Sequence, residues 1–264
     1  MPGVSFERRA IGAHGAALVS TRLERHGFLA AFTERTGGTS DPPYDSLDLA
    51  LHVGDDPDRV RDNRRAVCRG LRIAPFAVAE QVHGAAIAKV ARDRAGAGFD
   101  DPHGVVPGAD ALRTSAPGVA LAVLTADCVP MVAASPRSGL VAAVHAGWRG
   151  LAGGIVGATA ALFEDPGEVV VALGPCIGPD HYEVGESVVR AVGAGTDAGP
   201  VVERRNGRVF LDLAGTIRAE LATLGIGSVD DTGVCTACEP ERFFSYRRDG
   251  TTGRQAGVAV KLSG

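Results

Sequence analysis

Short apolar runs recur along this chain, and polar or glycine-rich turns separate them. Within each run the apolar residues are nearly continuous rather than alternating, which is typical of strands that are covered on both faces. We therefore predict strands at residues 28–32, 77–82, 86–91, 119–124, 131–134, 140–145, 169–173 and 256–262.

Three segments have the spacing of helices instead. Residues 57–71 carry Asp56 as a candidate N-cap and an apolar stripe along one face. A second helix is predicted over residues 150–163, and a third over residues 213–224 behind a capping Asp212. Because strands precede, separate and follow these helices, the pattern predicts an α/β (α+β) fold, although periodicity does not give the order of strands in the sheet.

The chain shows no clear linker, repeat or heptad pattern. Residues 94–106 and 193–200 are rich in turn-forming residues, but neither segment is long enough to require a domain boundary. With 264 residues, 45% of them hydrophobic, the chain can bury a substantial core. We therefore expect one domain over residues 1–264.

Composition and charge disfavour nucleic-acid-binding, membrane-spanning and disulfide-rich secreted proteins. The net charge of -4 and the pI of about 6.0 do not favour a nucleic-acid partner, which requires a basic surface. No uninterrupted apolar segment is long enough for a membrane span, and residues 1–9 lack the apolar core of a signal peptide. Five cysteines, an odd number, fit a reducing compartment better than a disulfide framework, so we expect a cytoplasmic protein.

Two histidines and one cysteine stand at or just after the ends of apolar runs: His83, Cys128 and His145. Two imidazoles and a thiolate suit a borderline-soft cation such as zinc, and three protein ligands leave one position open, as in catalytic sites. Their separations of 45 and 17 residues are not diagnostic, because isolated His and Cys residues in apolar runs are more often part of the core.

Four further residues are candidates for the same site. Asp127 precedes Cys128 and could orient a ligand histidine or act as a general base, although a turn aspartate is an equal alternative. Arg149, Arg247 and Arg248 could bind an anion, because a guanidinium matches phosphate geometry. A solvated basic turn is the competing interpretation for the last two.

Cys235 and Cys238 form a Cys-x-x-Cys pair. Without a second pair this spacing is a weak signal for a zinc knuckle or a redox dithiol, and we assign it no function from sequence.

Five longer words occur along the chain in this order: QVHG, TADC, VHAGWRG, GPCIGPDHYEVG and FFSYRRDG. Together they resemble the YfiH-like laccase-domain family, whose bacterial members are named purine nucleoside phosphorylases and formerly polyphenol oxidases. The resemblance runs from about Arg35 to the end of the chain. Two departures stand out, namely Asp48, where the family's Ser-Leu-Asn-Leu word has asparagine, and the additional Cys238.

The resemblance implies one domain of mixed β-sheets packed together and flanked by helices. It implies a metal site of two His and one Cys, which falls on His83, Cys128 and His145, with Zn²⁺ as the cofactor and Cu²⁺ able to occupy the site in vitro. The implied activities are phosphorolysis of adenosine, inosine and S-methyl-5'-thioadenosine, and hydrolytic deamination of adenosine. Implied partners are purine nucleosides and inorganic phosphate, with no nucleic acid and no membrane, and the protein is expected to be a monomer or a weak homodimer.

Three other functions stay open at this stage. A copper-dependent polyphenol oxidase is disfavoured because the seven histidines are scattered rather than clustered. A peptidoglycan-editing hydrolase of a cell-wall precursor could use the same activated water to cleave an amide. A non-catalytic binding protein would use Cys128 only for packing.

Overall fold

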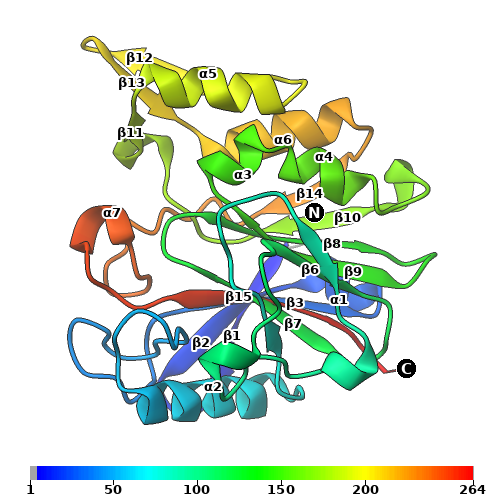
Figure 1. The fold of residues 1–264 in the computed structure, drawn as a ribbon, viewed down its shortest axis with the longest axis vertical. Helices are drawn as coiled ribbons and strands as arrows, with labels where there is room; N and C mark the ends of the chain where they lie inside the picture. The colour runs from blue at the N-terminus through cyan, green and yellow to red at the C-terminus, as the bar shows by residue number, and fades with distance from the viewer. Residues whose placement is uncertain (1–4, 264) are drawn as a thin grey trace.

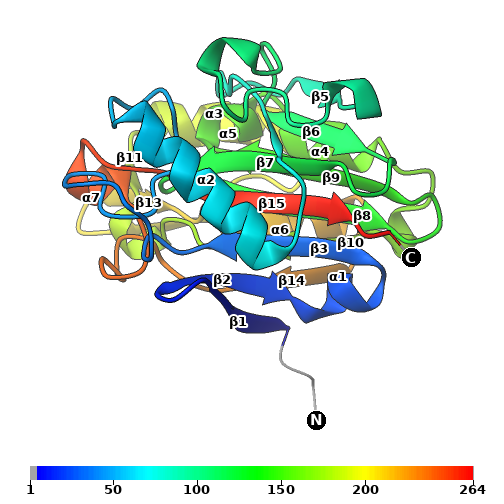
Figure 2. The same ribbon diagram turned by 90° about the horizontal axis from the view of Figure 1, so that it is seen from below.

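Two six-stranded sheets lie face to face and helices cover both outer sides, which gives four layers (Figures 1 and 2). The computed structural model describes residues 5–263. Both sheets are mixed, since antiparallel pairs dominate and a few neighbours run parallel. The predicted α/β (α+β) fold with mixed sheets is confirmed.

The first sheet contains the first and the last of the strands described, and the last one, β15, lies near its centre. Its pairs are antiparallel except at one edge, where β4 runs parallel to β7. In spatial order its strands are β1 (Phe6–Ile11), β2 (Gly15–Ser20), β3 (Phe28–Thr33), β15 (Gln255–Lys261), β7 (Ala120–Thr125) and β4 (Ala77–Val78).

The second sheet is built mainly from the middle of the chain. In order its strands are β14 (Ser228–Asp231), β10 (Val170–Leu173), β8 (Val129–Ser135), β9 (Leu140–Ala146), β6 (Ala111–Thr114) and β5 (Ile87–Lys89). A small third sheet lies beyond the helices of this side, with the order β11 (Glu183–Val184), β13 (Arg208–Leu211) and β12 (Val202–Arg205).

Burial on both faces explains the continuous apolar runs. In β7, Leu121 and Val123 enter the core between the sheets, whereas Ala120 and Ala122 enter the core on the outer side of the first sheet. The strands of the second sheet divide in the same way between the inner core and the core under the helices, as Met131 and Val132 of β8 show. The central strands therefore have no solvent face on which polar residues would alternate, whereas the edge strand β1 does expose Glu7 and Arg8.

The helices lie in two groups. The outer face of the first sheet is covered by α2 (Pro57–Leu71), as Figure 2 shows. The opposite side carries α3 (Trp148–Ala152), α4 (Ile155–Ala160), α5 (Glu186–Gly195) and α6 (Leu213–Thr223) (Figure 1). Two short helices, α1 (Thr21–Arg25) and α7 (Tyr246–Asp249), lie in connections. Among the residues described, no helix has both the length and the apolarity to cross a bilayer.

Most of the predicted elements are confirmed, and α2 has the predicted bounds. Its cap is also the predicted one, because the Asp56 side chain accepts a hydrogen bond from the Asp58 N–H. The predicted helix at 150–163 was wrong as one element, because the chain breaks between α3 and α4 at Gly154, which has a φ of 78°. The predicted strand at 77–82 ends at Val78, and Gln81 and His83 both adopt a positive φ.

The two sheets pack closely where β15 faces β8, and a glycine lies at the contact. A Cβ atom on Gly257 would lie 2.7 Å from the Cβ of Pro130 in the facing sheet. We expect Gly257→Ala to lower the free energy of unfolding by about 1–3 kcal/mol, because the packed layers would have to separate. Urea unfolding measures this change.

The matched control is Gly157→Ala in α4, where an added Cβ meets no atom within 4 Å. We expect it to be neutral or to stabilise by up to about 1 kcal/mol, since alanine is the better helix former. Equal effects of the two substitutions would contradict the close approach of the sheets.

Candidate metal centre and its cavity

Three segments that are distant in sequence bring two imidazoles and a thiol together. His83 lies in the loop after β4, Cys128 lies in the turn between β7 and β8, and His145 lies near the end of β9. One donor atom from each residue lies within 4.8 Å of those of the other two. His145 is buried, Cys128 is partly buried and His83 is exposed, so the group opens toward solvent on the side of His83.

A buried carboxylate holds the two histidines in place. Asp110 Oδ1 lies 2.8 Å from His145 Nδ1 and also accepts the backbone N–H of His83, while Oδ2 accepts the N–H of Gly84 at 2.6 Å. With Nδ1 bonded to this carboxylate, Nε2 is the ring atom of His145 that faces another partner, as in metal-bound histidines. Asp110 was missed from sequence, where the only signal is a lone aspartate at the start of an apolar strand.

The charges of the group stabilise one another. Burial disfavours the Cys128 thiolate, but the positive charge and hydrogen bonds of His145, together with those of His83, outweigh it and lower the pKa of the thiol to about 6. Burial likewise opposes protonation of His145, but the Cys128 thiolate and Asp110 raise its pKa to about 9. The site therefore favours the thiolate, which is the form that binds metal ions.

The backbone around the group is crowded and strained. A Cβ atom on Gly147 would lie 2.7 Å from Cys128 Sγ, so the residue that precedes α3 has to be glycine. Non-glycine residues with a positive φ gather here, at Gln81, His83 and Asp127. The side-chain amide of Gln81 both donates to and accepts from the backbone of Leu124, which fastens this loop to the end of β7. Strain of this kind is typical of functional sites.

Asp127 lies beside Cys128 but does not contact a histidine of the group. Its Oδ1 accepts the hydroxyl hydrogen of Thr236 at 2.7 Å, and its Oδ2 accepts the backbone N–H of Arg247 at 2.6 Å. The partner of His145 is Asp110 instead. Asp127 thus ties the turn after β7 to two segments near the C-terminal end of the chain.

A cavity of about 380 Å³ opens in front of the three donors. Arg149 lies over the Trp148 ring at 4.5 Å and Arg247 over the Tyr182 ring at 4.8 Å, and both arginines line the cavity. Arg248 does not line it, because its guanidinium bonds to the carbonyls of the preceding loop and pairs with Asp249. The lining also contains residues that we did not predict from sequence: His52, Gln81, Tyr182, Tyr246 and Arg254.

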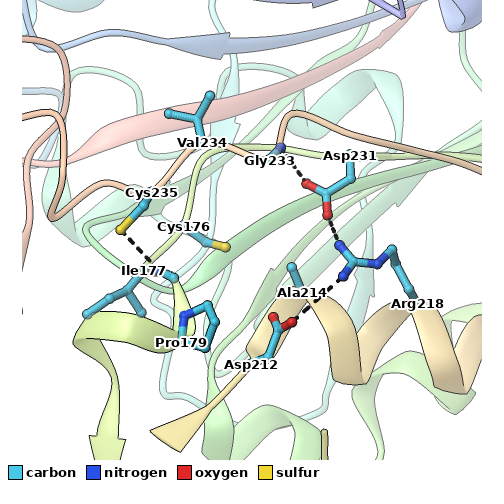
Figure 3. Close-up of a pocket in the computed structure, with 11 residues that line it drawn as sticks. Cys176, Ile177, Pro179, Asp212, Ala214, Arg218, Asp231, Gly233, Val234 and Cys235 are labelled. Atoms are coloured by element: carbon cyan, nitrogen blue, oxygen red, sulfur yellow. Dashed lines mark hydrogen bonds and ion pairs between the residues drawn. The ribbon is translucent and has the colours of Figure 1, made fainter. Parts of the chain in front are cut away.

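The cavity drawn in Figure 3 is a different one, beside α6, and has a volume of about 190 Å³. Its single guanidinium, Arg218, is already paired with two carboxylates, those of Asp212 and Asp231, so the described residues that line this cavity offer no unpaired cation for an anionic substrate. The cavity in front of His83, Cys128 and His145 instead combines several arginines with a thiolate and two imidazoles, which makes it the better candidate for an active site.

The donors present fit a metal ion. Two imidazoles and one low-pKa thiol are the ligand types of zinc and copper sites, and Asp110 supplies the outer hydrogen bond that such sites use to orient a ligand histidine.

Comparison with known proteins places the chain in a family. The sequence model of the family described as multi-copper polyphenol oxidoreductase laccase matches residues 29–261. The chain belongs to this family.

Relatives within the family carry the name of a nucleoside enzyme. The protein named purine nucleoside phosphorylase YlmD from Geobacillus stearothermophilus is 42% identical over 241 residues, which are 86% of this chain and 88% of that protein. The Escherichia coli protein named purine nucleoside phosphorylase YfiH is 39% identical over 233 residues, 87% of this chain and 92% of that protein.

Solved structures show the same fold. The crystal structure of YlmD from Geobacillus stearothermophilus superposes with a TM-score of 0.92 and 37% identity, covering 99% of this chain and all of that chain. That of a Bacillus licheniformis hypothetical protein YfiH gives a TM-score of 0.89 at 30% identity, with the same coverage.

Asp48 lies behind the cavity, next to the segment that carries Arg254. Its Oδ1 accepts the N–H groups of Ala50 and Arg254, but its buried Oδ2 has no hydrogen-bond partner. Burial raises the pKa of this carboxyl to about 7. The ionised form is therefore unfavourable in the folded protein.

Asp48→Asn is expected to stabilise the protein increasingly as the pH rises. The folded chain keeps a proton on Asp48 up to about pH 7, whereas the unfolded chain releases it near 3.8, so wild-type stability falls through this window. At about 1.4 kcal/mol per pKa unit, the gain from asparagine approaches roughly 4 kcal/mol above pH 7. Unfolding of both proteins at pH 5 and pH 8 measures it. Asp62→Asn on the exposed face of α2 is the control, and a pH-independent gain at Asp48 would contradict the assignment.

Asp110→Asn is expected to weaken Zn²⁺ binding by His83, Cys128 and His145 by about 10–100-fold, because the outer partner of His145 is lost. An amide has one oxygen, so it cannot accept from His83, Gly84 and His145 as the carboxylate does. Competition with a chromophoric chelator measures the affinity. The control Asp165→Asn changes an exposed aspartate that also accepts a backbone N–H, and an unchanged affinity in Asp110→Asn would exclude the positioning role.

Proposed function

We propose that this protein is a zinc-dependent purine nucleoside phosphorylase that acts on adenosine, inosine and S-methyl-5'-thioadenosine, and that it also deaminates adenosine. The observation that carries the proposal is the meeting of His83, Cys128 and His145 at a cavity lined by arginine and aromatic side chains. The names of the relatives support the reaction class.

The arginines supply the charge that phosphate requires. Arg149 and Arg247 are exposed to the cavity, and Arg254 lines it from the segment before β15. Guanidinium groups bind phosphate oxygens in a bidentate manner. Arg247 is held in place by bonds to the carbonyls of His181 and Glu183, so its position is set before substrate enters. The substrate-binding role of Arg248 stays a prediction. Its bonds to the carbonyls of Thr236 and Phe243 support an indirect role, in which it holds this loop in place beside the cavity.

Aromatic side chains around the same cavity suit a purine. Trp148, Tyr182 and Tyr246 all line it, and Tyr246 is an exposed aromatic residue. Burial raises the pKa of Tyr182 to about 12, so its phenol stays neutral and can donate a hydrogen bond. A planar base held between such rings would leave its sugar near the arginines.

His83, Cys128 and His145 are the residues that would hold the ion. When bound there, zinc supplies Lewis-acid chemistry and lowers the pKa of water, which serves deamination. For phosphorolysis, the arginines hold the attacking phosphate while the base leaves, and hydrogen-bond donors stabilise its developing charge. We retain Asp127 as the candidate proton carrier, because it lines the cavity beside Cys128 and its two hydrogen bonds hold the carboxylate in position.

The family description supports a copper-dependent polyphenol oxidase as the second candidate. The three donors would accept copper as well as zinc, since copper binds such ligands more tightly. We rank this function lower because the group contains two histidines and a cysteine rather than several histidine-rich clusters.

All five cysteines are free, which supports a cytoplasmic location.

Incubation of the protein with adenosine and with inosine, each with and without phosphate, followed by chromatography, tests the proposal. Base released only when phosphate is present supports phosphorolysis, and inosine formed from adenosine supports deamination. Turnover of neither nucleoside, by protein that contains zinc, would exclude both activities.

Cys128→Ala is expected to leave a folded protein that has lost zinc and at least about 100-fold in base release, because one of three ligands is missing. The matched control is Cys68→Ala, since that thiol lies on the buried face of α2, away from the cavity, and burial raises its pKa to about 11. We expect the control to keep full activity. Full activity in Cys128→Ala would show that its sulfur takes no part in the chemistry.

A further inference from the structure

A second group of soft donor atoms lies in two loops, apart from the group formed by His83, Cys128 and His145. It consists of His181, from the turn Pro179–His181, and of Cys235 and Cys238. One donor atom of each lies within 4.8 Å of those of the others, and His181 Nε2 lies 3.1 Å from Cys238 Sγ. We propose that His181, Cys235 and Cys238 form a second metal site for a thiophilic cation, of which Zn²⁺ is the best match.

Backbone hydrogen bonds bring the two sulfurs of the Cys-x-x-Cys segment together. The Cys238 N–H donates to the Cys235 carbonyl at 3.2 Å, which closes a turn and brings both sulfurs to one side. The Gly178 N–H donates to Cys235 Sγ at 3.2 Å. A backbone N–H directed at sulfur stabilises the thiolate, which is the form that binds a metal ion.

The loop that carries His181 and the loop that carries Cys235 and Cys238 pack closely against each other. Cys176 and Cys235 form a parallel bridge, in which the Thr236 N–H donates to the Cys176 carbonyl. A Cβ atom on Gly178 would lie 3.3 Å from Cys235 Sγ, so the loop passes directly against the sulfur. Figure 3 shows Cys235 turned toward this loop while the Cys176 sulfur points elsewhere. Burial raises the pKa of Cys176 well above its usual range, so it stays a neutral thiol outside the group.

The charges around the group favour a cation. The carboxylates of Asp180 and Glu239 lie near the Cys238 thiol and add negative charge around the group. A bound cation would offset this charge. Two thiolates and an imidazole from separate segments are a ligand set of zinc sites, and the spacing of the cysteines is one that zinc sites use.

A cation here would brace the wall of the catalytic cavity. The His181 carbonyl accepts from Arg247, and His181 is followed directly by Tyr182. Thr236, which follows Cys235, donates its hydroxyl hydrogen to Asp127. The ion would therefore join the two loops that position Tyr182, Arg247 and Asp127, and its ligands are positioning residues rather than catalytic ones.

The exposure of His181 and Cys238 distinguishes this second site from the first. Both sites offer three protein ligands, but the first includes the buried His145, whereas two of the three ligands of the second are exposed to solvent that competes for the ion. We expect a chelator to remove this ion before the one held by Cys128.

Titration of reduced, metal-free protein with Zn²⁺ against a chromophoric chelator tests the proposal. We expect two equivalents of bound zinc in the wild type and one in each of the single variants Cys238→Ser and Cys128→Ala. The double variant, which combines Cys128→Ala with Cys238→Ser, should bind none. His103→Ala, which removes an exposed histidine outside both groups, should retain two. Cobalt substitution adds a spectroscopic check, since Cys238→Ser should remove most of the thiolate-to-cobalt charge-transfer band while Cys128→Ala keeps the larger part.

A structural readout tests the bracing role. We expect Zn²⁺ to raise the thermal midpoint of Cys128→Ala, which retains only the second site, and to leave that of the double variant unchanged. One equivalent of zinc in wild-type protein whose five thiols are all reduced would overturn the proposal, and so would an undiminished second equivalent in Cys238→Ser. Neither outcome depends on nucleoside turnover, so failure of the proposed function is a separate result.

Discussion

The carboxylate of Asp110 is the contact on which the arrangement of His83, Cys128 and His145 depends. It accepts hydrogen bonds from His145, from the His83 backbone and from Gly84, so one buried side chain orients the His145 ring and anchors the loop that carries His83. Without it His145 would have no fixed tautomer, and the loop after β4, which is strained at Gln81 and His83, would lose its attachment. The low pKa of Cys128 in turn depends on the histidines that Asp110 holds in place.

Sheet pairing delivers Asp110 to this position. The register of β6 with β9 sets Ala111 against Val144, so the next pair along the strands is Asp110 and His145. A backbone hydrogen bond from His145 to the Asp110 carbonyl continues the ladder at the same point. Strand pairing therefore places His145 and its partner Asp110, whereas His83 and Cys128 come from a loop and a turn at strand ends.

The same layout connects the two groups of soft donors. Asp127 links the turn that bears Cys128 to Thr236, and Arg247 links the opposite wall to His181. The segments after β10 and after β14 thus act as a brace for the cavity. In the phosphorolysis proposed above, the positions of the arginine and aromatic groups would set the alignment of phosphate and base, so a brace of this kind would affect the rate.

The amino-acid sequence by itself determined the donor types, the α2 helix with its Asp56 cap, most of the buried strands and the family words. These features depend on local periodicity and on residue chemistry, which are readable along the chain. Only the tertiary structure decided that Asp110 rather than Asp127 supports His145, that Arg254 lines the cavity, and that His181 joins the Cys-x-x-Cys pair. Those contacts join residues tens of positions apart, and strand register and loop packing, which no local pattern records, bring them together.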